Sequence, residues 1–190
     1  FSENMEYKIE YYLQDSYVEN TYTLLDTLTE VESGLVGSIV SAQNINHESL
    51  NNYELNHSIF NNVDNNKEID FEIIYDVNGE KPCLKLYFNL KKENISIDKY
   101  FSNNTIFNKI ERNALFQITC VDINGNKHKW IYIINNPSEE NNNIVNKNME
   151  NMPYGTYQIR EIKIGGISND DVNNTITFQL NYSNSNSLNN

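Results

Sequence analysis

Glycine, proline and cysteine are all scarce in this chain of 190 residues, which has 7 glycines, 3 prolines and 2 cysteines. So little glycine and proline excludes collagen-like repeats and proline-rich linkers. The two cysteines, Cys83 and Cys120, lie far apart in different apolar segments and lack the spacing of a zinc site. We therefore expect two free thiols rather than an interdomain disulfide, and neither a metal nor a cofactor.

Positive charge is also scarce, because 14 Lys and Arg residues face 26 Asp and Glu residues and the net charge is −12. No basic cluster occurs, so nucleic acid and anionic membrane surfaces are unfavourable partners. The chain has no apolar run of about 20 residues and no recognisable signal peptide, so membrane insertion is not expected. If the protein is exported, its sorting signals lie outside these residues.

Segments in which apolar and polar residues alternate fill most of the sequence, with the period of half-buried β-strands. Asn78-Gly79 and Asn124-Gly125 are typical of tight hairpin turns. Helical turns are expected only at residues 48–53 and 106–113, and the polar residues 137–151 predict a long loop. The predicted strands are residues 7–13, 21–29, 36–43, 53–56, 69–76, 83–90, 95–99, 114–122, 127–134, 155–163 and 175–182.

This pattern predicts a mainly β chain, and its length suits two small domains. We place the boundary in the polar junction at residues 91–94, between two long strands. The expected domains are residues 1–92 and 93–184, followed by a flexible tail at 185–190. A short junction between consecutive domains is typical of a stalk that holds something away from a surface.

The strand-like segments of the first half occur in an order shared with a known family. They are residues 7–14, 22–27, 34–42, 53–55 and 84–89. In this order they resemble the MucBP-type repeats of Gram-positive surface proteins. The resemblance implies a β-grasp-like module, which serves in that family either as a spacer or as a mucin-binding module. Asn51-Asn52 departs from the family pattern, which usually has a glycine before the tyrosine.

In the second half, a lysine and a glutamate each end the apolar face of a predicted strand. Lys99 ends the face of residues 95–99, and Glu161 ends that of residues 157–161. Either charge alone would be expensive to bury, so two such charges need each other. We therefore expect Lys99 and Glu161 to pair inside a β-sheet core.

The segment 152–161 (MPYGTYQIRE) is the most specific motif in the chain. Together with residues 95–99 and 116–121 it resembles the Cna-B (SpaA-type, prealbumin-like) β-sandwich of pilins and sortase-anchored adhesins. The resemblance covers residues 94–184. It implies an autocatalytic isopeptide bond, in which Lys99 attacks an asparagine amide and Glu161 is the promoting acid. Burial favours this chemistry, because it favours the neutral amine and the neutral acid.

The asparagine partner of that bond is left open by the sequence. Leu180 occupies the position where the family has its asparagine. Asn181 is the first candidate if a β-bulge turns its side chain inward. Asn184 is the alternative, because strand alternation directs its side chain to the same inward side as that of Leu180. Without such a bond, Lys99 and Glu161 form a buried ion pair with no chemistry.

The leading interpretation is a structural stalk or shaft fragment of a cell-wall-anchored surface protein or pilus subunit in a Gram-positive bacterium. Its expected place is the extracellular cell-wall surface, and its expected partners are other domains of the same protein. Apart from single-turnover isopeptide formation it is not expected to be an enzyme, because none of its three histidines belongs to a nucleophile motif. The alternative is an adhesin module that binds host mucin, glycan or extracellular-matrix protein. Trp130 is expected to pack in a core, with an exposed glycan-stacking role as the alternative.

Overall fold

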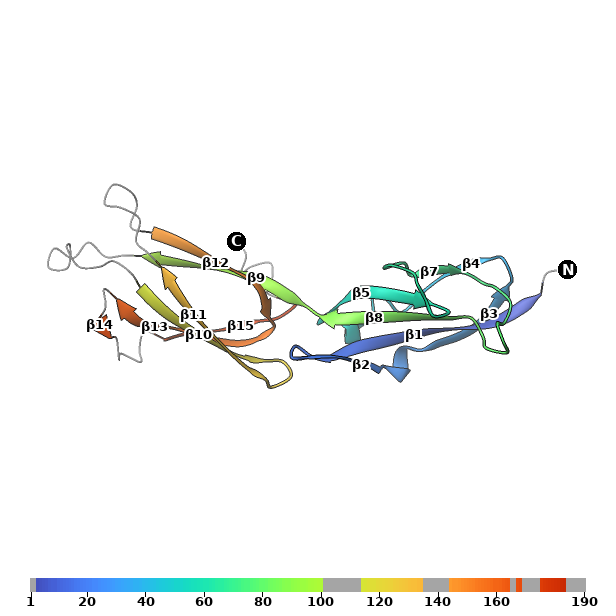
Figure 1. The fold of residues 1–190 in the computed structure, drawn as a ribbon, viewed down its shortest axis with the longest axis horizontal. Helices are drawn as coiled ribbons and strands as arrows, with labels where there is room; N and C mark the ends of the chain where they lie inside the picture. Colours follow the sequence, from blue (N-terminus) through green and yellow to red (C-terminus); the bar gives the residue numbers. More distant parts are fainter. Residues whose placement is uncertain (1–2, 101–113, 135–143, 165–166, 169–174, 184–190) are drawn as a thin grey trace. The chain divides into compact units, whose positions relative to one another are not determined.

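The computed structural model describes residues 3–100, 114–134, 144–164, 167–168 and 175–183. The chain divides into two compact units, Phe1–Lys91 and Lys92–Asn190, which we call unit 1 and unit 2 (Figure 1). Strands dominate both units, so the prediction of a mainly β fold is confirmed. Among the described residues, no helix is long and apolar enough to cross a membrane.

Unit 1 is built around one mixed sheet with the strand order β2-β1-β8-β5-β6, to which β3 adds by pairing with β1. A separate two-stranded sheet joins β4 to β7. The elements are β1 (Asn4–Ser16), β2 (Glu19–Leu24), β3 (Glu30–Leu35), β4 (Ile39–Ser41), β5 (Tyr53–Phe60), β6 (Val63–Asp64), β7 (Asp70–Glu72), β8 (Cys83–Leu90) and the 3₁₀ turns η1 (Asp26–Leu28) and η2 (Glu48–Leu50).

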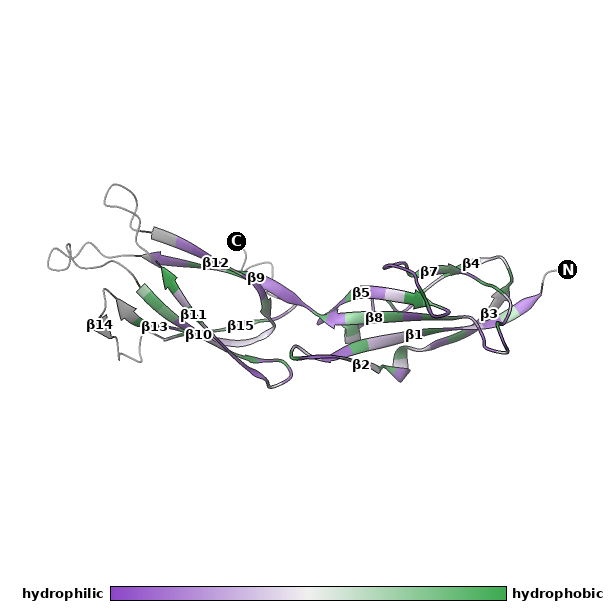
Figure 2. Ribbon diagram, in the orientation of Figure 1, coloured by the Kyte–Doolittle hydropathy of each residue, from purple (hydrophilic) through white to green (hydrophobic). Residues whose placement is uncertain are grey.

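The central strands of unit 1 are its first and last, β1 and β8, and they pair in parallel. The register runs from Lys8 opposite Cys83 to Leu13 opposite Phe88. Every second side chain of β8 is buried, as a sheet with one covered face requires. Figure 2 shows the same alternation as green and purple bands along the ribbons. The core on the covered face includes Tyr11, Leu84 and Leu86, none of which is exposed.

The described strands of unit 2 form two sheets. The larger has the order β11-β10-β13-β14, with β15 also paired to β13, and the smaller pairs β12 with β9. The strands are β9 (Lys92–Tyr100), β10 (Ala114–Asp122), β11 (Lys127–Ile134), β12 (Ile144–Pro153), β13 (Gly155–Ile164), β14 (Ile167–Ser168) and β15 (Thr175–Leu180).

The two sheets of unit 2 face each other across a shared core. Ile118 of β10 and Tyr157 of β13 are fully buried, and Ile95 of β9 and Met149 of β12 are only 3% and 2% exposed. The ammonium group of Lys147, on β12, lies 5.2 Å from the ring centre of Tyr132 on β11. Such contacts join β12 and β9 to the inner face of the larger sheet.

Both predicted hairpin turns are present. Asn78 and Gly79 have φ values of 55° and 79°, and their neighbours Val77 and Glu80 exchange two backbone hydrogen bonds. Gly125, with φ of 86°, lies in the turn between β10 and β11. Positive φ is easily adopted by glycine and tolerated by asparagine, which explains why these dipeptides predicted the turns.

Two predictions of local structure are wrong. Residues 144–151, predicted as loop, belong to strand β12, which buries Met149 and Met152 and exposes Asn146, Asn148 and Glu150. The strand predicted at residues 21–29 is divided into β2 and η1, and β3 follows. The helical turn predicted at 48–53 is the 3₁₀ turn η2, whereas the one at 106–113 lies outside the described residues.

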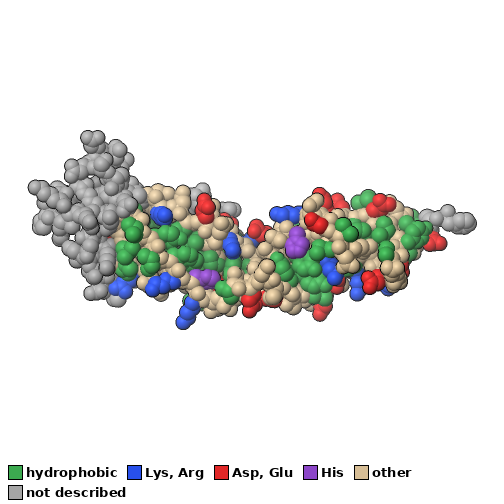
Figure 3. All heavy atoms as spheres, viewed as in Figure 1, with side chains coloured by type: hydrophobic (Ala, Val, Ile, Leu, Met, Phe, Trp, Pro, Cys, Tyr) green, Lys and Arg blue, Asp and Glu red, His purple; other side chains and the backbone are tan. Residues whose placement is uncertain are grey.

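The two units differ in charge. Unit 1 has sixteen Asp and Glu residues and five lysines, a net charge of −11, whereas unit 2 has ten acidic and nine basic residues, a net charge of −1. On the face shown in Figure 3, acidic and basic side chains are interspersed among hydrophobic ones. Nearly all of the excess negative charge therefore belongs to unit 1.

Candidate functional site

Lys99 and Glu161 meet between the two sheets of unit 2. The Lys99 Nζ lies 2.7 Å from Glu161 Oε2, and each side chain is only 15% exposed. Phe116 pairs with Glu161 across β10 and β13, and its ring centre lies 6.0 Å from Lys99 Nζ. The lysine therefore bridges from the smaller sheet to a carboxylate and an aromatic face of the larger one.

The path of the chain explains why these two side chains meet. Strands β12 and β13 are joined at a corner around Tyr154, where Pro153 pairs with Lys92 of β9. Lys99 is seven residues from that corner along β9, and Glu161 is six residues from Gly155 along β13. Because strands rise by a similar distance per residue, the two side chains reach the same depth in the sandwich.

Asn181 is not brought to this pair. It directly follows Leu180, which pairs with Gly155 at the opposite end of β13 from Glu161. Six strand residues separate these ends, which amounts to about 20 Å. Asn181 Oδ1 instead accepts hydrogen bonds from the backbone N–H and the hydroxyl group of Ser183. Asn184 lies outside the described residues.

In the segment 152–161, close packing against β10 requires a glycine at position 155. A Cβ atom on Gly155 would lie 2.3 Å from the Val121 carbonyl oxygen and 2.6 Å from the Asp122 Cα atom. Tyr157, two residues later, is fully buried and donates its hydroxyl hydrogen bond to the Pro153 carbonyl at 2.5 Å. This part of the motif therefore shapes the corner that positions β13 against β10.

Asp122 is a buried carboxylate that the sequence analysis did not identify as such. Its Oδ1 accepts hydrogen bonds from the backbone N–H groups of Asn124 and Asn126, and its Oδ2 lies 2.6 Å from His128 Nε2. These contacts close the β10–β11 hairpin. The ring of His128 stacks on Trp130 at 5.7 Å, and Trp130, which is partly exposed, stacks on the fully buried Tyr157 at 6.3 Å.

Glu30 is the corresponding buried carboxylate of unit 1, and it too was missed. It is 8% exposed and accepts a hydrogen bond from the Tyr11 hydroxyl at 2.6 Å. The backbone N–H of Gln43 donates to both of its oxygens at 3.1 Å. Burial and the bond to Glu30 raise the pKa of Tyr11 well above its usual value. Glu30 therefore links β1, β3 and the segment that follows β4.

Both cysteines are free thiols, as predicted, with Cys120 buried and Cys83 partly exposed. Burial raises the pKa of Cys120 to about 11. Burial, together with a hydrogen bond donated to Glu10 Oε1 at 3.1 Å, raises the pKa of Cys83 to about 12. Both thiols are therefore protonated and poorly nucleophilic at neutral pH. In the described part of the chain, no three His, Cys, Asp or Glu side chains are grouped as metal ligands.

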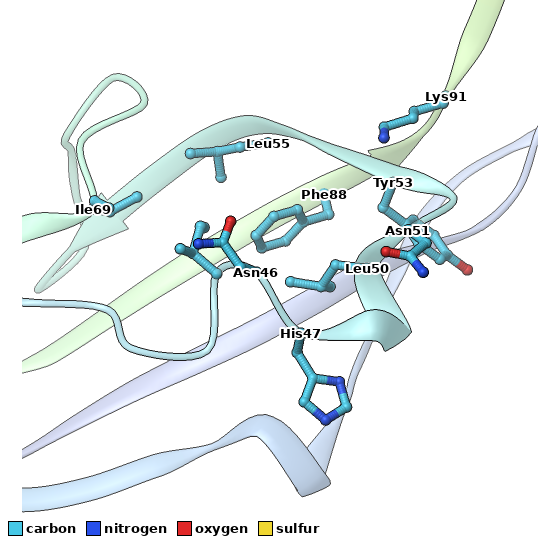
Figure 4. A pocket seen from close by; sticks show the side chains of 10 residues that line it. Asn46, His47, Leu50, Asn51, Tyr53, Leu55, Ile69, Phe88 and Lys91 are labelled. Carbon is cyan, nitrogen blue, oxygen red and sulfur yellow. The ribbon is translucent and has the colours of Figure 1, made fainter. Parts of the chain in front are cut away.

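A pocket of about 310 Å³ opens beside the core of unit 1 (Figure 4). Leu50 and Phe88 face one another across it, and both are at least 95% buried. His47 points away from these two side chains, and its Nδ1 accepts a hydrogen bond from Ser49 N–H at 3.1 Å, which caps η2. We interpret the pocket as a gap at the edge of the core rather than as a reactive site.

No protein-family model and no curated protein matches the chain. Among solved structures, a streptococcal ancillary pilin is similar over 93% of this chain and 58% of the pilin chain, with 9% identity and a TM-score of 0.31. This chain thus spans little more than half of that pilin. Similarity at this level does not establish a shared fold.

Proposed function

We propose that this chain is a structural shaft segment of a Gram-positive surface protein or pilus subunit, exposed at the cell wall and built to resist tension rather than to catalyse turnover. In this proposal unit 1 is a β-grasp-like module and unit 2 a Cna-B-like sandwich. The parallel centre of unit 1 and the Lys99–Glu161 pair at the end of the 152–161 motif support these assignments.

The pairing of the first and last strands of unit 1 carries the proposal. Because β1 and β8 are parallel, the chain enters at one end of the pair and leaves at the other. Tension on the two ends of unit 1 pulls β1 and β8 past each other along their length. All the hydrogen bonds between them are then loaded together, whereas in a peeling geometry they would break one after another.

The junction between the units suits the same role. Only Lys91 separates β8 from β9. The backbone N–H of Lys91 donates a hydrogen bond to the Asn52 carbonyl at 2.9 Å. The Tyr17 hydroxyl donates a hydrogen bond to the Lys91 carbonyl at 2.5 Å. The last residue of unit 1 is therefore fixed to that unit, so tension reaches β8 without a slack linker.

Single-molecule force spectroscopy on the full chain tests the proposal. Pulled from its two ends, unit 1 should unfold at high force in one step. In the control, one handle is moved to a tag inserted between Asn78 and Gly79, in the exposed turn before β8. Force then acts at the same end of β1 and β8 and peels them apart, so the unfolding force should fall sharply. Equal forces in the two geometries would contradict a mechanical role.

An isopeptide bond at Lys99 stays a prediction, and intact mass tests it. Condensation of the Lys99 amine with an asparagine amide releases ammonia, so a cross-linked chain should be about 17 Da lighter than its sequence mass. Lys99→Ala and Glu161→Ala should restore the full mass. A wild-type chain at full mass would leave Lys99 and Glu161 as a non-covalent tie between the sheets.

A further inference from the structure

Unit 1 has a second sheet face, opposite the core, that carries an ordered set of aromatic rings. The rings of Tyr12, Tyr87 and His57 stack across β1, β8 and β5, with centroid distances of 4.9 and 4.5 Å and interplanar angles of 15° and 3°. A register shift between Leu55 and His57 turns the histidine to this outer face. Tyr22 packs edge-on against Tyr87 at 5.1 Å. Rings that hold one another lose little freedom when a ligand binds.

A groove of about 760 Å³ continues from these rings along the same face. Its floor includes Lys8, Glu10, Cys83 and Lys85, and the hairpin turn at residues 77–80 forms one wall. The groove adjoins the ring stack, because Lys85 Nζ lies 5.8 Å from the Tyr12 ring centre and the Tyr12 hydroxyl donates to Glu10 at 3.4 Å. Its volume falls within the range of roughly 300–1,000 Å³ typical of small-molecule sites.

The lining of this groove carries more positive than negative side chains, although unit 1 is strongly acidic. Three of the five lysines of unit 1, Lys8, Lys81 and Lys85, line it together with the two carboxylates Glu10 and Glu80. Lys81 pairs with Glu6, whereas neither Lys8 nor Lys85 forms an ion pair among the described residues. At physiological ionic strength charges are screened beyond about 8 Å, so the charges of the lining itself, rather than the net charge of −11, determine what the groove attracts. Glu10 already accepts hydrogen bonds from Tyr12 and Cys83, which leaves Lys8 and Lys85 as the charges open to an anionic ligand.

The position of the groove favours a sugar over a peptide. Its floor strands β1 and β8 lie in the middle of the sheet, where each is paired on both sides. Their backbone N–H and C=O groups are therefore already used, and an extended peptide could not add a strand there. Amine, carboxylate and amide side chains remain, and together they donate to and accept from the hydroxyl groups of a sugar.

We propose that this outer face of unit 1 binds a carbohydrate that carries a carboxylate, with Lys8 and Lys85 contacting the carboxylate and the Tyr12–Tyr87–His57 stack contacting the sugar ring. This goes beyond the shaft role, which depends on β1–β8 pairing and not on this surface. The groove would give a structural segment a binding function as well.

Binding can be measured by NMR titration of the full, isotope-labelled chain. The probes are a hyaluronan tetrasaccharide and 3′-sialyllactose, which carry internal and terminal carboxylated sugars. Chitotetraose and lactose are their neutral counterparts, and triglutamate is the acidic peptide control. At least one acidic sugar should shift the amide signals of Lys8, Lys85 and Tyr87, and its neutral counterpart should bind at least tenfold more weakly. If the hyaluronan tetrasaccharide binds, the groove recognises an internal carboxylated sugar, and if 3′-sialyllactose binds, it recognises a terminal one.

A pair of matched double variants tests the contact residues. Lys8→Gln with Lys85→Gln should weaken acidic-sugar binding about tenfold or more, because each lysine loses a charge-assisted hydrogen bond. Lys127→Gln with Lys129→Gln makes the same change in net charge on exposed positions of β11 and should leave binding unchanged. The proposal is overturned if no acidic sugar binds at millimolar concentration, if neutral sugars or triglutamate bind equally well, or if both double variants weaken binding alike. None of these results would alter the force measurement.

Discussion

The two units connect their first and last strands in different ways. In unit 1, β1 and β8 are direct neighbours, and tension loads their backbone hydrogen bonds in shear. In unit 2, β9 and β15 belong to different sheets. The first residue of β9, Lys92, pairs with Pro153, and the last residue of β15, Leu180, pairs with Gly155. The start of β9 and the end of β15 therefore both lie at the corner around residues 153–155. Unit 2 therefore depends on side chains that cross between its sheets, of which Lys99 is the clearest.

The two units also bury their carboxylates differently. Glu30 of unit 1 is held by neutral donors, the Tyr11 hydroxyl and a backbone N–H. Glu161 of unit 2 is held by the Lys99 ammonium group. Removing a neutral donor leaves an unsatisfied polar group, whereas removing one ion of a buried pair leaves a charge without its counterion, which is more destabilising.

The largest effect is expected from Glu161→Ala, which removes the carboxylate that holds the Lys99 ammonium group between the sheets. It should lower the unfolding free energy of unit 2 by about 3 kcal/mol. Unit 1 should keep its stability, because its core does not include this pair. Hydrogen exchange with mass spectrometry can follow the two units separately in one sample.

The matched control is the double variant Lys99→Met, Glu161→Leu. Apolar side chains of similar volume remove both charges together, so much of the lost stability should return. If Glu161→Ala and the double variant are both within about 0.5 kcal/mol of wild type, the pair is not a structural tie.

A smaller effect is expected in unit 1 from Tyr11→Phe. The variant keeps the ring, which stacks on Phe88 at 6.0 Å, but removes the donor to Glu30 and the acceptor for Asn44 N–H. The unfolding free energy of unit 1 should fall by about 1–2 kcal/mol in denaturant titrations. Tyr12→Phe, on the outer face with one long hydrogen bond, is the control and should change it by less than about 0.5 kcal/mol. Equal losses would show that Tyr11 has no special role.

The sequence predicted local features well where pattern and turn residues agree. The strands at residues 83–90, 114–122 and 127–134 have the predicted bounds, because alternation is uninterrupted and turn residues flank it. Strand phase also indicated the inward orientation of Lys99 and Glu161. It could not locate Asn181 along the sheet, because that depends on the register of β15 with β13.

What the sequence did not predict depends on partners distant along the chain. Glu30 is buried because its acceptors are satisfied by Tyr11 and Gln43, and no local pattern links these three residues. Asp122 has the sequence context of an ordinary turn residue, whereas in the structure it is 3% exposed and contacts His128. Strand β12 was missed because half of its residues are polar, and its pairing with β9 is not encoded in its own sequence.

The smallest effect concerns the two thiols, which give one probe in each unit. With pKa values of about 12 for Cys83 and about 11 for Cys120, against a usual value of 9.0, both should alkylate slowly at pH 8, and buried Cys120 more slowly. Because folding raises these pKa values, their contribution to stability is complete below pH 9 and is lost as pH rises toward 11–12. Peptide mass spectrometry after timed iodoacetamide treatment measures both rates, and urea-unfolded chain is the control. If Cys120 reacts as fast folded as unfolded, the packing of β10 against the smaller sheet is refuted.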